Sequence, residues 1–152
     1  MPSWRNAIRI GQNIPSSLKT NPTHRGIIFY MDIEKREIYR SIAELAYVIA
    51  MADKGLSAEE RFAFTKIAEE ELDFESWAAQ SRFELLDEVI QPSIEKAYKD
   101  ALHDLKKHKD HFTPEMKATA IRVMHKVAKA CSGFSPKEAT IIERFKKDLE
   151  TL

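Results

Sequence analysis

The stretch ELAYVIAMADKGLSAEERFAF, residues 44–64, decides how this chain folds. It connects two segments of helical periodicity through a short link that contains Gly55 and Ser57. A glycine directly after a helical run favours the left-handed conformation that ends a helix. Ser57 and Glu60 have the spacing of a capping box, in which each side chain binds the backbone amide of the other residue. The stretch therefore predicts a helix end, a tight turn and a helix start.

A second copy of this pattern lies near the end of the chain. Gly133 follows Gly55 by 78 positions, Ser135 and Glu138 repeat the capping-box spacing, and Pro136 occupies the position where proline favours a helix start. The segments before the two turns share one apolar spacing, i, i+4, i+7, i+11 and i+14. Its members are Ile38, Ile42, Leu45, Ile49 and Ala52 in the first copy and Met116, Ala120, Val123, Val127 and Ala130 in the second. We interpret this as a duplicated helix-turn-helix.

The composition favours an all-α fold. The chain has 152 residues, which is enough for one hydrophobic core, and its 43% hydrophobic content is typical of a globular protein. Four glycines are few for a β-rich chain with many turns. We therefore predict a compact all-α bundle of six to seven helices, built from two pseudo-repeated helix-turn-helix halves.

Periodicity and start signals give the expected helix limits. The first helix should begin near Ile33 with Asp32 as its N-cap, and Pro92 should open the fourth. We expect helices over residues 33–52, 58–72, 76–90, 92–108, 114–131 and 136–149. The second and third of these are separated by so few residues that we expect them to be nearly continuous.

Residues 1–31 differ from residues 32–152, and we expect an N-terminal arm followed by a single helical domain. The arm has four basic residues, no acidic residue and several breaks at proline and glycine. Trp4, Ile8 and Ile10 could pack on the domain, and the apolar run 26–31 should form an extended strip. No signal peptide or membrane-spanning run is recognisable, and the single cysteine fits a reducing compartment. We therefore expect a cytoplasmic protein without a transmembrane segment.

The residues Ala52-Asp53-x-Gly55-x-Ser57-x-x-Glu60 resemble a family signature. It is the Ala-Asp-Gly-x-hydrophobic-Ser-x-x-Glu pattern of the TerB-like tellurite-resistance proteins, and the resemblance extends over about residues 34–150. Lys54 is additional to that pattern, and Cys131 and Ser132 stand where the second copy should have aspartate. The resemblance implies a small all-helical domain that acts in chemical-stress resistance in bacteria and binds metal through acidic residues.

Asp53, Glu59 and Glu60 are the first candidate site, and Asp53 and Glu60 are its expected metal ligands. An acidic turn could bind a protein partner or, with backbone carbonyls, a divalent cation such as Ca²⁺ or Mg²⁺. The alternative is structural, with Glu60 occupied in the cap and Asp53 facing solvent. No catalytic residues are recognisable, so we expect a non-catalytic module with no cofactor except a divalent cation.

A histidine-rich stretch is the second candidate. Asp104, His108 and His111 would share one helical face if the helix continued that far, and imidazole with carboxylate can bind Zn²⁺. This hypothesis describes a metal-dependent enzyme, but intervening lysines oppose a cation. Cys131 is a third candidate, either a small buried side chain or a thiol that binds a soft metalloid.

The charge is balanced overall, at 24 basic and 24 acidic residues, but it is unevenly distributed. Residues 53–75 contain eight acids and three bases, whereas residues 96–129 contain nine bases and four acids. Solvated helix surfaces explain most of this. The alternative is a homo-oligomer formed through acidic and basic faces, or a purely structural oligomerising protein. The lysines are not interleaved with aromatic residues, so we expect protein partners of a stress-response system and no nucleic acid.

Overall fold

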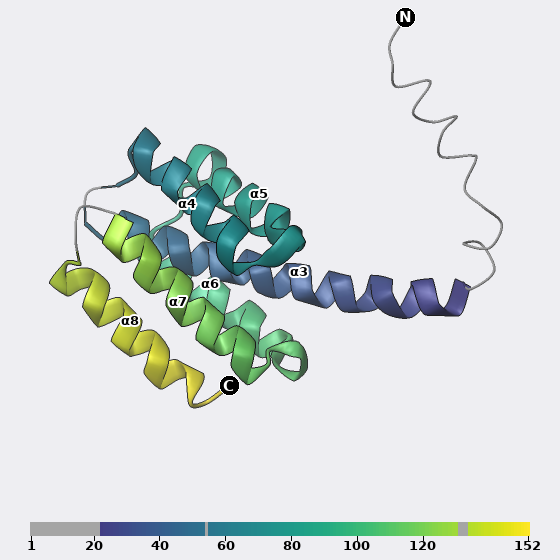
Figure 1. Ribbon diagram of the computed structural model, residues 1–152. Coiled ribbons are helices and arrows are strands. Elements are labelled where there is room, and N and C mark those ends of the chain that lie inside the picture. Colours follow the sequence, from purple (N-terminus) through teal and green to yellow (C-terminus); the bar gives the residue numbers. More distant parts are fainter. Residues whose placement is uncertain (1–21, 54, 131–133) are drawn as a thin grey trace, which may run out of the picture. The chain divides into compact units, whose positions relative to one another are not determined.

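The computed structural model describes residues 22–53, 55–130 and 134–152, with side chains from residue 33 onward, and in these residues it contains helices and no strands. The expected all-α bundle is therefore confirmed. The described α-helices, labelled in Figure 1, are α3 (Pro22–Met51), α4 (Ala58–Glu71), α5 (Trp77–Leu85), α6 (Ile94–Lys107), α7 (Pro114–Ala130) and α8 (Pro136–Leu149). Three short segments complete them, namely the 3-10 turns η1 (Asp73–Ser76) and η3 (Lys109–His111) and the π-helical turn η2 (Leu86–Ile90).

The first helix begins earlier than expected. α3 starts at Pro22, so the predicted extended strip over residues 26–31 and the predicted N-cap at Asp32 are both wrong. Pro22 has the fixed φ that suits the first turn of a helix. Gly26 costs only about 1 kcal/mol inside a helix, which propagation along a 30-residue helix can offset.

The chain divides into two compact units, residues 1–33 and residues 34–152. The described hydrophobic core belongs to the second unit. The expected packing of Trp4, Ile8 and Ile10 concerns residues outside the described part of the chain, and the boundary after residue 31 stays a prediction. None of the helices that the structure describes is long and apolar enough to cross a membrane.

The C-terminal part of α3 is buried on every side. From Ile38 to Ala50, only Arg40 is more than 9% exposed, and Figure 1 shows this part of the helix enclosed by the others. The sequence predicts one apolar face here, whereas the structure buries the whole circumference. A helix of this kind is the centre of a core rather than one of its walls.

The two copies of the apolar spacing are buried to different extents. All five positions of the first copy are buried, from Ile38 to Ala52. In the second copy Ala120, Val123 and Val127 are buried, Met116 is partly buried and Ala130 is exposed. α7 therefore packs through one face, as a peripheral helix does, while its counterpart α3 is central.

Helix starts follow the local signals in the sequence. Both predicted capping boxes are present, at Ser57 with Glu60 and at Ser135 with Glu138. The Thr113 hydroxyl accepts a hydrogen bond from the Met116 amide at the start of α7. Pro92 does not open the fourth helix as expected, because Ser93 caps it and α6 begins at Ile94.

Replacing the capping serines tests these assignments. S57A and S135A should each lower the free energy of unfolding by about 1 kcal/mol, because a helix-terminal amide loses its acceptor. S81A is the matched control, since Ser81 is exposed within α5 and should leave stability nearly unchanged. Urea denaturation measures all three variants. Equal stability of the cap variants and the control would show that the boxes contribute nothing.

Candidate functional site

The turn between α3 and α4 holds the first candidate residues, Asp53 and Glu60. Gly55 has φ of +84°, which glycine adopts without strain. The Ser57 amide donates to Glu60 Oε2 at 3.0 Å, and the Glu60 amide donates to Ser57 Oγ at 3.2 Å. Asp53 is exposed beside this braced turn. Glu60 is therefore engaged in the cap through one oxygen, while the Asp53 side chain faces solvent.

The corresponding capping box at the start of α8 is more deeply buried. Glu138 is 0% exposed, and its Oε2 accepts a hydrogen bond from the Ser135 amide at 2.9 Å. Cys131, the third candidate, and Gly133 lie outside the described residues. The two capping boxes thus share hydrogen bonds but differ in exposure. Among the described residues, exposed acids accompany the Ser57–Glu60 box, namely Asp53 and Glu59, whereas Glu138 is buried.

The structure separates the residues of the histidine-rich candidate. α6 ends at Lys107, His108 is its C-cap and His111 belongs to η3, so the continuous helical face on which that hypothesis depended is absent. His108 Nδ1 contacts a carboxylate oxygen of Glu34 on α3. Within the described ranges, no group of three or more His, Cys, Asp or Glu side chains is arranged to hold a metal ion. Metal binding by Asp104, His108 and His111 stays a prediction.

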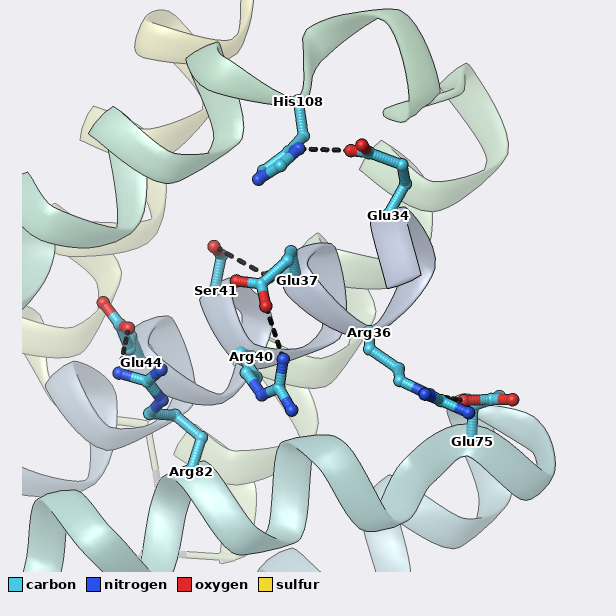
Figure 2. A network of polar contacts seen from close by, with 9 residues as sticks. All are labelled: Glu34, Arg36, Glu37, Arg40, Ser41, Glu44, Glu75, Arg82 and His108. Atoms are coloured by element: carbon cyan, nitrogen blue, oxygen red, sulfur yellow. Dashed lines mark hydrogen bonds and ion pairs between the residues drawn. The ribbon is translucent and has the colours of Figure 1, made fainter. Parts of the chain in front are cut away.

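Sequence reasoning missed a polar network along α3, which Figure 2 shows. Arg36 Nε donates to Glu75 Oε2 at 2.7 Å, and the Glu75 side chain is only 4% exposed. Arg82 on α5 approaches Glu44 at 3.4 Å, and the Ser41 hydroxyl donates to a backbone carbonyl one turn earlier. The partners are 38 or 39 residues apart in the chain, so no local pattern could reveal them. The network connects α3 to α5 and η1.

An acidic cleft of about 540 Å³ lies between α3, η1 and the helices α4 and α7. Asp73 on its wall binds Lys35 at 2.5 Å and Tyr39 at 3.3 Å. Burial acts to raise the pKa of Asp73, but the bonds from Lys35, Tyr39 and the Glu75 amide outweigh it and hold the pKa below its ordinary value. Burial and the neighbouring Asp73 raise the pKa of the Tyr39 hydroxyl.

The other strongly bound acid of this cleft is Glu71. Lys126 binds it at 2.7 Å and Arg122 at 3.0 Å, and the Lys126 bond in particular lowers the pKa of the carboxyl. The carboxylates of Asp73 and Glu71 are therefore already matched by cations of the protein. An added metal ion would have to compete with them.

Glu44 has the most unusual electrostatic setting in α3. Its side chain is 5% exposed, and burial raises its pKa from the ordinary 4.5 to about 7. Arg82 opposes this rise, whereas Asp104 and Asp100 on α6 add to it. With a pKa of about 7, this carboxyl is partly protonated near neutral pH, where an ordinary glutamate is fully ionised.

Comparisons with known proteins agree with the fold. A family model described as tellurite resistance protein TerB matches residues 40–150, which is most of the unit that contains the core. No curated protein and no solved structure matches the chain significantly. The match contains the Asp53 turn, both capping boxes and the buried part of α3 from Arg40 onward.

The Glu44 carboxyl predicts a specific pH dependence. The folded state binds its proton more tightly than the unfolded state between pH 4.5 and about 7, so stability from this group is full below that window and is lost as the pH rises through it. In E44Q, the change in the free energy of unfolding across this pH window should be smaller by up to about 3 kcal/mol. Urea denaturation between pH 5 and pH 8 measures the difference. E69Q, an exposed control on α4, should keep the wild-type profile; identical profiles for E44Q and E69Q would contradict the assignment.

Proposed function

Because this chain belongs to the TerB family of tellurite resistance proteins, we propose that it is a non-catalytic binding module of a cytoplasmic chemical-stress response. The observation that supports this proposal is the turn at Asp53. The exposed Asp53 carboxylate lies two positions before Gly55, which has the left-handed conformation, and four positions before the doubly hydrogen-bonded cap at Ser57.

Two kinds of ligand fit an exposed carboxylate on a rigid turn. One is a divalent cation, which would take Asp53, backbone carbonyls of the turn and water, since Ca²⁺ needs about six to eight oxygen ligands. The other is a cationic side chain of a protein partner. Glu60 contributes little to either, because its Oε2 is bound to the Ser57 amide. We therefore expect weak cation binding or partner docking centred on Asp53.

Calorimetric titration of the full chain with Ca²⁺, Mn²⁺ and Zn²⁺ tests the cation. D53A should weaken binding by about tenfold or more, because the exposed carboxylate on which the proposed site is centred is lost. D110A removes an exposed acid from η3 and should leave binding unchanged. H111A and D104N test the histidine-rich alternative. If cation binding survives D53A and is lost in H111A and D104N, the metal site lies at the end of α6 and not at Asp53.

Absence of heat with every ion would leave the protein partner as the ligand. Crosslinking of the full chain in lysate from its own cells should then yield a complex that D53A loses and D110A retains. Equal recovery by both variants would contradict a docking role for the Asp53 turn.

A further inference from the structure

A further cleft lies between α4, α5 and the turn η2. Its volume is about 210 Å³. Its floor is the aromatic pair Phe64 and Phe83, which stack with ring centroids 4.0 Å apart. These rings give the cleft a rigid apolar base.

The rim of this cleft is acidic. Glu84, Asp87 and Glu88 line it together with Arg61, which is bound to Asp87 at 2.5 Å. Glu84 and Glu88 are exposed, and no cation of the described residues pairs with them. Two carboxylates four positions apart on one helix repel each other, so an external cation is favoured here. The geometry fits a long basic side chain whose stem lies on the aromatic floor while its charged end meets the rim.

The same chain carries a complementary surface at the end of α6. Lys106, Lys107 and Lys109 are exposed, and in the described part of the chain none of them forms an ion pair. Figure 1 shows the connection between α6 and α7 away from the α4–α5 pair, on a different side of the bundle. One copy therefore cannot fill its own cleft with its own lysines.

We propose that the cleft between α4 and α5 accepts the lysine cluster at the end of α6 from a second copy of this chain, so that the protein associates head to tail. The charges of the whole chain balance, 24 against 24, although each of these two surfaces is strongly unbalanced. A second copy supplies the missing charge at both surfaces at once. A contact between two different surfaces is heterologous, and it produces open chains or closed rings. This contact does not involve Asp53.

Analytical ultracentrifugation of the full chain tests this association. At about 50 mM salt the average mass should rise with protein concentration, and at about 500 mM salt it should fall toward the monomer, because exposed charge pairs are screened. E84K/E88K and K106E/K107E should each weaken self-association by about tenfold or more, since like charges then face each other.

Mixing the two double variants gives the decisive result. The mixture uses the neutral variants E84Q/E88Q and K106Q/K107Q, because reversed charges on both surfaces would attract each other. The first retains an intact lysine cluster and the second an intact cleft, so an equimolar mixture should form a one-to-one dimer that does not grow further. E69K/E150K and K137E/K147E change the same charges on exposed positions elsewhere and should associate as the wild type does. If circular dichroism shows that a charge-reversed variant is unfolded, the neutral variant at the same positions, E84Q/E88Q or K106Q/K107Q, replaces it. The neutral variant should also weaken self-association.

Three results would overturn the proposal. They are a monomeric wild type at low salt, an equal loss of association in the control variants, and failure of the mixture to form dimers. A monomeric wild type would leave the cleft to a basic segment of a different protein. D53A should not affect self-association, so a failure here and a failure of the Asp53 site can be told apart.

Discussion

The burial of the C-terminal part of α3 on all sides, from Ile38 to Ala50, is the constraint on which the rest of this structure depends. A helix at the wall of a core can direct its polar residues to water, but a central helix cannot. Between Glu34 and Glu44, charged side chains of α3 therefore meet partners from other elements, including Arg82 on α5, Glu75 on η1 and His108 at the end of α6. These contacts set where the outer helices lie along the central one. Removing one partner would leave a poorly solvated charge, which costs more than the pair contributes.

The turn at Asp73 shows how this network shapes the surface. Asp73 has φ of +45°, a left-handed conformation that costs a non-glycine residue about 1 kcal/mol or more. Bonds from Lys35, Tyr39 and the Glu75 amide hold its side chain and offset that cost. The same turn leaves Phe74 84% exposed. The strain is thus a consequence of anchoring η1 to the central helix.

Features that depend on neighbouring residues could be predicted from the sequence, and features that depend on distant ones could not. Both capping boxes and the turn at Gly55 follow from spacings of three or four residues, and the structure contains both boxes and the turn. The start of α3 was misplaced because Gly26 and Asp32 look like breaks, although a long helix can continue through them. The Glu34–His108 contact joins residues 74 positions apart, and the sequence alone suggested a metal ligand at His108.

The distribution of charge follows from the same central helix. The charged side chains that the structure describes on α3, from Glu34 to Glu44, all have a partner of opposite charge. Among the described residues, charged side chains without such a partner lie on outer elements, such as Glu84 on α5 and Lys107 at the end of α6. Substitutions along α3 should therefore act mainly on stability, because they disturb buried pairs. Substitutions at exposed outer positions should act mainly on binding, because they leave the core intact. An all-helical bundle with this division can change its partners by surface substitution while the central helix keeps the fold.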